Sequence, residues 1–145
     1  MTKYTQGEFY PKNLYKYIKK SNLPIKYKSS WELYFMNFLD LNQNVIEWGY
    51  EVLKIPYYNP FKKKINNYYP DFLIKYFDKN KNLNIEIIEI KPIKEANLKE
   101  SKTKNDKLKF ILNIYKWKAA DNWCKKRNIK FRIISERDMF HNGKI

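Results

Sequence analysis

Residues 71–91, DFLIKYFDKNKNLNIEIIEIK, form the stretch of sequence from which the architecture can be worked out. Asp71–Phe77 is rich in aromatic and β-branched residues and predicts a strand, whereas the polar run Asp78–Asn82 predicts a turn. Leu83–Lys91 predicts a second strand, which ends at Pro92 because proline cannot donate to a strand ladder. Together these segments predict a β-hairpin.

The register of this hairpin determines which side chains meet. Side chains alternate along a strand, so Glu89 and Lys91 share one face. A three-residue loop at 79–81 makes paired residue numbers sum to 160, which places Asp71 opposite Glu89; a sum of 162 would place it opposite Lys91. Both registers predict two carboxylates and a lysine at the open end of the hairpin.

Two carboxylates side by side repel each other unless a positive charge lies between them. Carboxylate oxygens suit Mg²⁺, which polarises a phosphodiester and lowers the pKa of a bound water. Lys91 would orient that water or offset the charge that develops on the phosphoryl group. The pair Asp71 and Glu89 therefore predicts a Mg²⁺ site for phosphodiester cleavage, with Mn²⁺ as an alternative ion.

The flanking sequence predicts further helices and strands around the hairpin. Ser29 followed by Glu32 is typical of a helix start with a capping box. The predicted elements are a helix over about 30–41, extended pieces over 45–48 and 51–55, a turn bracketed by Pro56 and Pro60, an exposed loop over 93–104, a helix over about 106–127, a strand over 129–134 and a last short helix capped by Ser135. This order predicts an α/β fold in which helices flank a small mixed β-sheet.

The composition limits the classes of function. The chain has 145 residues, which suits a single domain with a basic N-terminal arm or short helix over about 1–26. Its formal charge of +15 suggests a nucleic-acid partner, but Lys, Asn, Ile, Tyr and Phe all have A/T-rich codons, so codon bias is an equal alternative. One cysteine and one histidine exclude a disulfide framework and most histidine metal sites. We expect neither a signal peptide nor a membrane segment, and a reducing, intracellular setting.

Several motifs resemble known nucleases. Pro70-Asp71 with Glu89-Ile90-Lys91 resembles the PD-(D/E)xK nuclease superfamily. Other segments resemble TnsA-like endonucleases and the head completion nucleases of T-even-like phages, in the order in which those families carry them. They are Tyr27-Lys28-Ser29-Ser30-Trp31-Glu32, the segment 42–57, Ile88-Glu89-Ile90-Lys91-Pro92, and Asn113 with Lys116-Trp117 and Ala119-Ala120. The resemblance runs from about Tyr27 to Asp138.

The resemblance implies a restriction-endonuclease-like fold and a metal-dependent DNA endonuclease. It implies that Glu32 joins Asp71 and Glu89 at the metal, and that Lys91 is the catalytic lysine. It also implies a role in finishing the packaged phage head, in the host cytoplasm or the virion, with head or neck proteins as partners. Lys28 replaces the usual arginine and Asn67 replaces an expected basic residue, which puts DNA contact in doubt but removes no ligand.

Each residue also has a simpler interpretation. Glu32 could only cap its helix, and Glu89 with Lys91 could form a weak surface ion pair. Accessory contacts to DNA are assigned to Lys28, Ser30, Asn113 and Lys116, with ordinary surface positions as the alternative. Glu51 either contacts the site or faces solvent, and solvent is the favoured alternative. Lys62-Lys63-Lys64 is either a solvated turn or a grip on a DNA backbone.

Two other functions remain open beside the nuclease. One is a non-catalytic component of the virion that binds DNA ends, whose DNA binding would depend on salt and not on Mg²⁺. The other is a TnsA-like or restriction-type subunit that cuts only with a partner. A homodimer is a further possibility, because enzymes of this superfamily often pair to cut both strands.

Overall fold

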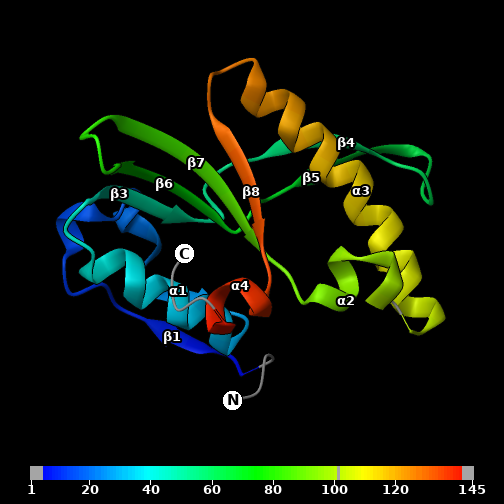
Figure 1. The fold of residues 1–145 in the computed structure, drawn as a ribbon, viewed down its shortest axis with the longest axis horizontal. Helices are drawn as coiled ribbons and strands as arrows, with labels where there is room; N and C mark the ends of the chain where they lie inside the picture. The colour runs from blue at the N-terminus through cyan, green and yellow to red at the C-terminus, as the bar shows by residue number, and fades with distance from the viewer. Residues whose placement is uncertain (1–4, 101, 142–145) are drawn as a thin grey trace.

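The computed structural model describes residues 5–100 and 102–141, and its core is a four-stranded mixed sheet (Figure 1). The order is β3-β6-β7-β8, in which only the β7–β8 pair is parallel. The strands are β1 (Gly7–Phe9), β2 (Ile25–Tyr27), β3 (Val45–Tyr50), β4 (Ile55–Asn59), β5 (Lys64–Tyr68), β6 (Phe72–Phe77), β7 (Leu83–Ile90) and β8 (Lys130–Ile134). The helices are α1 (Ser30–Leu41), α2 (Ile93–Ala96), α3 (Lys104–Lys125) and α4 (Glu136–His141), with 3₁₀ turns at Leu14–Lys16, Lys20–Asn22 and Leu98–Glu100.

The register of the central hairpin is the predicted one. Phe72 pairs with Ile88 and Phe77 with Leu83, so paired residue numbers sum to 160 throughout β6 and β7. The turn is fixed by Asp78, whose carboxylate accepts hydrogen bonds from the backbone N–H groups of Asn80 (2.9 Å) and Asn82 (3.0 Å). One residue beyond the ladder, the same register brings Asp71 opposite Glu89.

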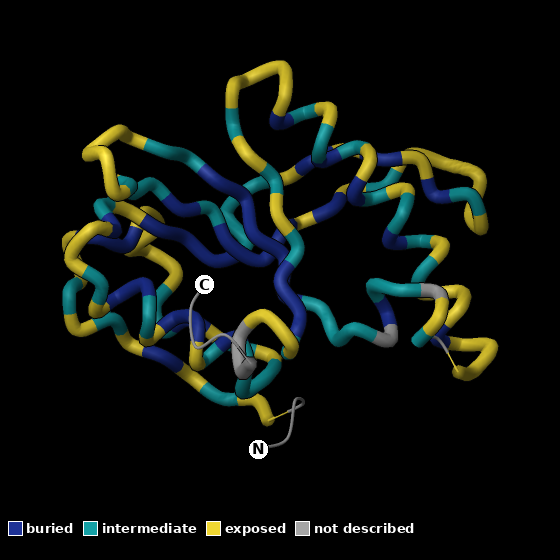
Figure 2. The backbone as a smooth tube through the Cα atoms, viewed as in Figure 1, coloured by how far each residue is buried: buried dark blue, intermediate teal, exposed yellow. Residues whose placement is uncertain are grey.

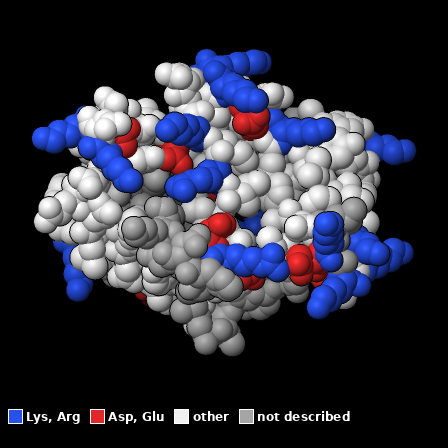
Figure 3. All heavy atoms as spheres, viewed as in Figure 1, with Lys and Arg blue, Asp and Glu red and all other residues white. Residues whose placement is uncertain are grey.

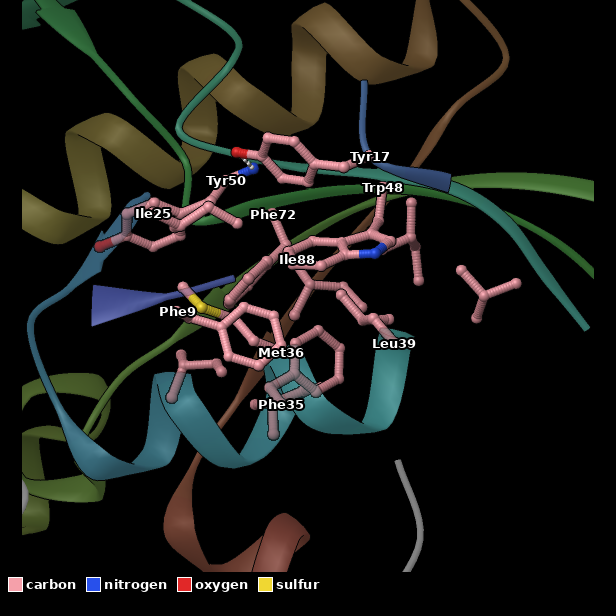
Figure 4. Packing of buried hydrophobic residues seen from close by; sticks show 14 residues of the cluster. Phe9, Tyr17, Ile25, Phe35, Met36, Leu39, Trp48, Tyr50, Phe72 and Ile88 are labelled. Carbon is pink, nitrogen blue, oxygen red and sulfur yellow. Dashed lines mark hydrogen bonds between the residues drawn. The ribbon is translucent and has the colours of Figure 1, made fainter. Parts of the chain in front are cut away.

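The sheet separates two hydrophobic cores because alternate side chains of β7 point to opposite faces. Ile88 packs on the side of α1, whereas Ile87 packs on the side of α3 and the β4–β5 hairpin. Figure 4 shows the first core, in which side chains of α1 meet Trp48 and Phe72. In Figure 2 the central strands are buried along most of their length, and the turns that join them are exposed.

The N-terminal segment packs against the fold instead of forming a free arm. Phe9, Tyr17 and Ile25 belong to the core on the α1 side. The ammonium of Lys16 is buried and donates to the carbonyl oxygens of Leu39, Asp40 and Asn42 at 2.7–2.9 Å. These carbonyls lie at the end of α1, so a lysine side chain caps the helix from another segment.

Two predicted elements were wrong, the extended piece over 51–55 is a strand only from Ile55 onward, and one strand was missed. The segment 93–104 is not a plain loop but contains α2, and α3 already begins at Lys104, where Thr103 caps it. Pro56 lies inside a strand and not at a turn, because it pairs with Asn67 in the β4–β5 hairpin. The second strand of that hairpin had no sequence signal, since most of its side chains are exposed.

The other predicted elements are present, and their bounds differ from the predicted ones by no more than two residues, as is usual for helix and strand ends. They are the helices over 30–41 and 106–127, the strand over 129–134 and the last short helix. The α/β class with a small mixed sheet is confirmed. Among the described residues, every helix is too short or too polar to traverse a lipid bilayer.

Candidate active site

The four predicted catalytic side chains line one pocket of about 420 Å³. Asp71 precedes β6, Glu89 lies near the end of β7 and Lys91 follows it, so the hairpin supplies three of the four. Glu32 comes from the first turn of α1. Other side chains at this pocket include Lys28, Glu51, Tyr68, Glu95, Lys109 and Lys116. The pocket therefore gathers acidic and basic groups from both sides of the sheet.

Hydrogen bonds to the backbone fix the two hairpin carboxylates. The N–H of Asp71 donates to Glu89 Oε1 at 3.1 Å, and the N–H of Ile90 donates to Asp71 Oδ2 at 2.8 Å. The other oxygen of Glu89 lies 3.4 Å from the ammonium of Lys91. Both carboxylates are buried, so the strand register itself holds them side by side.

Glu32 caps α1 and also reaches the pocket, so its two interpretations are compatible. Its N–H donates to the hydroxyl of Ser29 at 3.1 Å, which is one half of a capping box. Its carboxylate accepts from the N–H of Lys28 at 2.7 Å and from the hydroxyl of Tyr50 at 3.0 Å. Both bonds converge on Oε1, so neither occupies Oε2.

The pocket concentrates negative charge at a cost to the fold. Burial raises the pKa of the Asp71 carboxyl well above its ordinary value, and the charges of Glu89 and Glu32 raise it further. Burial also raises the pKa values of Glu89 and Glu32, although Lys91 opposes the shift at Glu89. Three carboxyl groups that resist ionisation together are typical of a site whose charge is balanced by a bound cation.

The donor set suits a cation that keeps an open coordination sphere. Within the part of the chain that the structure describes, no three His, Cys, Asp or Glu side chains form a complete metal cluster. Mg²⁺ does not need one, because it commonly binds through one or two carboxylates and keeps several waters. The buried hydroxyl of Tyr68 lies beside Glu89 without a hydrogen bond of normal geometry among the described residues. Asp71 and Glu89 thus fit Mg²⁺ as an open pair of hard oxygen ligands.

Two lysines face these carboxylates in different electrostatic states. Burial lowers the pKa of Lys91, but the neighbouring carboxylates, first that of Glu89, outweigh it and the net shift is upward. Burial and the charge of Lys91 together lower the pKa of Lys116, whose ammonium lies 5.8 Å from the ring centres of Tyr57 and Tyr68. The carboxylates therefore stabilise the positive charge of Lys91, whereas the charge of Lys91 repels that of Lys116.

Comparison with known proteins agrees with this arrangement. A family model described as "TnsA-like endonuclease N terminal" matches residues 42–136. The chain belongs to the TnsA-like endonuclease family. It is also 36% identical over 137 residues to the "Head completion nuclease" of Enterobacteria phage T4, with 90% of each protein covered.

Membership of the TnsA-like family confirms the restriction-endonuclease-like fold that the motifs implied. The prediction of an endonuclease is confirmed at the level of the family. The matched range contains the hairpin residues Asp71, Glu89 and Lys91, whereas Glu32 lies before it. The metal ion, the DNA substrate and the roles of individual residues stay predictions.

The accessory residues differ in where they lie. Lys28 lines the pocket and forms an ion pair with Glu51 at 2.8 Å, and Lys116 also lines it. Asn113 is buried and does not line it, but it donates to the backbone carbonyl of Glu95, which does, at 3.2 Å, so it ties α2 to α3. Ser30 is not among the pocket residues either. The structure therefore brings two of the four accessory residues to the site.

Sequence reasoning missed three side chains at this site of the TnsA-like fold. Glu51 was expected to face solvent, but it lines the pocket, because the chain turns there through a left-handed backbone conformation (φ 52°). Tyr50 and Tyr68 come from strands whose pairing partners were unknown. These tyrosines can be placed beside the carboxylates only when the strand pairing is known, and no local sequence pattern reveals that pairing.

Proposed function

We propose that this chain is a Mg²⁺-dependent DNA endonuclease that hydrolyses phosphodiester bonds as a phage head completion nuclease acting on packaged DNA. The observation that carries the proposal is the hairpin register, which holds Asp71 against Glu89 with Lys91 at 3.4 Å from the latter. Membership of the TnsA-like endonuclease family and the likeness to a phage head completion nuclease support it.

Each side chain has a defined part in this reaction. Asp71 and Glu89 would hold Mg²⁺, or Mn²⁺ in its place, and Glu32 would complete the site as a third carboxylate from the same pocket. The ion, when bound, supplies Lewis-acid polarisation of the scissile phosphate and a nucleophilic water at neutral pH. Lys91 keeps its proton because its pKa is raised, so it acts as a fixed charge that faces the phosphate and not as a general base. Lys116 and Lys28 would contact neighbouring phosphates.

The decisive experiment is cleavage of supercoiled plasmid by the purified protein in Mg²⁺, in Mn²⁺ and in EDTA. We expect nicking or linearisation with either ion and none in EDTA. Lys91→Ala should be inactive, and Lys19→Ala, which removes an exposed lysine far along the chain from the hairpin, should cut like the wild type. Cleavage that persists in EDTA or in Lys91→Ala would contradict the proposal.

An inactive but folded wild type would support one of the alternatives instead. Salt-dependent DNA binding that does not need Mg²⁺ would indicate a DNA-end-binding component of the virion. Cleavage that begins when a phage head or neck protein is added would indicate a subunit that depends on its partner. Light scattering of the same sample would show whether the active form is a homodimer.

The hydroxyl of Tyr50 supplies a more specific prediction. It donates to Glu32 Oε1, so Tyr50→Phe leaves that carboxylate with one donor fewer while it preserves the ring in the core. Loss of a hydrogen bond behind a ligand typically weakens metal affinity or activity by about 10–100-fold. We expect a higher Mg²⁺ concentration for half-maximal cleavage in Tyr50→Phe. An unchanged Mg²⁺ titration would show that Glu32 does not depend on this tyrosine.

A further inference from the structure

The β4–β5 hairpin carries an unusual concentration of positive charge. Lys62, Lys63 and Lys64 follow one another at its tip and all three are exposed. From Val52 to Pro70 the chain has four lysines and no acidic residue, although the whole chain has 30 basic and 15 acidic residues. Among the described residues none of the tip lysines forms an ion pair.

The tip is an ordered structure and not a loose loop. The side-chain oxygen of Asn59 accepts from the N–H groups of Phe61 (3.0 Å) and Lys62 (3.1 Å), and its amide donates to Asn66 at 2.9 Å. The inner face of the hairpin is buried on α3, through residues such as Tyr57. Three adjacent exposed lysines thus extend from a turn whose backbone is fixed.

The hairpin is continuous with the active site at its other end. Asn67, Tyr68 and Tyr69 line the pocket that contains the carboxylates. In Figure 1, β4 and β5 run from the middle of the molecule to its edge beside α3. Strands rise roughly 3.3 Å per residue, so the Cα atoms of Lys64 and Tyr68 are about 13 Å apart.

The neighbouring helix extends the same basic surface. From Lys107 to Lys118 helix α3 has four lysines and again no acidic residue. Figure 3 shows that acidic side chains elsewhere on this face lie among the basic ones. The lobe made of the hairpin and this part of α3 is therefore purely basic, and it borders the pocket in which a phosphodiester would be cut.

We propose that this basic hairpin, defined as residues 54–69, grips the sugar–phosphate backbone of duplex DNA beside the cut site. The proposal rests on the proposed DNA endonuclease function, because the pocket must hold the scissile phosphate. Duplex DNA rises roughly 3.4 Å per base pair, so the tip lysines reach phosphates about four base pairs from the cleaved bond. These contacts position the duplex and read no sequence.

The test compares two matched double variants. Lys62→Ala/Lys63→Asn changes the tip, and Lys79→Ala/Lys81→Asn changes the β6–β7 turn at the far end of the sheet from Asp71. Lys63 and Lys81 both have left-handed backbones (φ 54° and 62°), which asparagine tolerates well, so the two pairs are equivalent in backbone and charge. Equal melting temperatures would show that all proteins are folded.

Binding is measured by fluorescence anisotropy with a labelled 30-base-pair duplex in EDTA, over a series of salt concentrations. The logarithm of the binding constant falls as the logarithm of the salt concentration rises. Each lost phosphate contact should make this dependence less steep by about 0.9, hence by about 1.8 for the tip pair. We expect the tip pair to bind at least about tenfold more weakly at 0.1 M salt, and the control pair to match the wild type.

Because EDTA suppresses cleavage, binding and catalysis are judged separately. Suppose that the salt slopes of the wild type and the tip pair differ as expected, but the wild type fails to cut plasmid in Mg²⁺. In that case the hairpin proposal stands and the nuclease proposal fails. If the two variant pairs bind alike, or the wild type does not bind duplex DNA, the hairpin proposal is overturned whatever the cleavage assay shows. Binding of the tip to vesicles of anionic lipid, without binding to DNA, would also overturn it.

Discussion

Asp71→Asn will reduce DNA cleavage by about 10³-fold, the upper range for loss of one preorganised electrostatic group in an active site. The substitution removes the negative charge that would hold Mg²⁺, but asparagine keeps an oxygen that can accept from the N–H of Ile90. The loss should therefore come from chemistry and not from misfolding. The measurement is the initial rate of plasmid nicking in Mg²⁺, with circular dichroism of both proteins as a check on the fold.

The same substitution should make the metal-free protein more stable. Because the pKa of Asp71 is raised in the fold, ionisation of this carboxyl destabilises the folded state at neutral pH. We expect Asp71→Asn to raise the free energy of unfolding by about 1 kcal/mol in EDTA at pH 7.5, a common gain when an active-site charge is removed.

The sign of the pH dependence provides the control. An unfolded aspartate has a pKa of about 4, so the stability that the protonated Asp71 contributes is fully present below that pH. It is lost as the pH rises through the higher folded pKa. The difference between variant and wild type should thus be small at pH 4 and grow towards pH 8. A variant that is inactive but less stable than the wild type at pH 7.5 would contradict this account.

Lys16→Met will destabilise the fold by about 3 kcal/mol. The substitution removes three hydrogen bonds to carbonyl oxygens at the end of α1, and each lost bond costs about 1 kcal/mol. The carbonyls of Asp40 and Asn42 keep a second donor, from Asn13 and Val45, whereas Lys16 provides the bond to Leu39. The methionine chain still fills the space of the lysine stem, so no large cavity opens. The midpoint of urea unfolding, measured at constant pH, reports the change.

The matched control for this lysine is Lys19→Met, which lies three residues further on and is exposed. It should leave the midpoint within about 0.5 kcal/mol of the wild type, as surface substitutions usually do. Equal midpoints for Lys16→Met and the wild type would show that water replaces the ammonium at no cost. In that case the N-terminal segment would not be needed to cap α1.

The central hairpin could be predicted because local chemistry specifies it. The polar turn around Asp78 fixes the loop length, the loop length fixes the register, and the register alone brings Asp71 to Glu89. By contrast, the contacts of Glu32 with Tyr50 depend on how α1 docks against β3, which no local pattern encodes. The resemblance to known nucleases supplied that residue where periodicity could not.

Other features escaped prediction for identifiable reasons. The strand β5 reads Lys-Ile-Asn-Asn-Tyr, and its stability comes from pairing with β4 and packing of Tyr68 against α3, not from β propensity. Lys16 looked like part of a solvated basic segment, since nothing nearby in sequence signals that its ammonium is buried. Burial of a lysine is rare enough that composition argues against it.

The predicted catalytic residues depend on different parts of the fold, because they lie far apart along the chain. The β6–β7 hairpin can form early because its contacts are local, and it brings its two carboxylates and lysine together by itself. Glu32 joins them only when α1 has packed on the sheet, where the hydroxyl of Tyr50 donates a hydrogen bond to its carboxylate. A half-folded chain therefore lacks a complete centre.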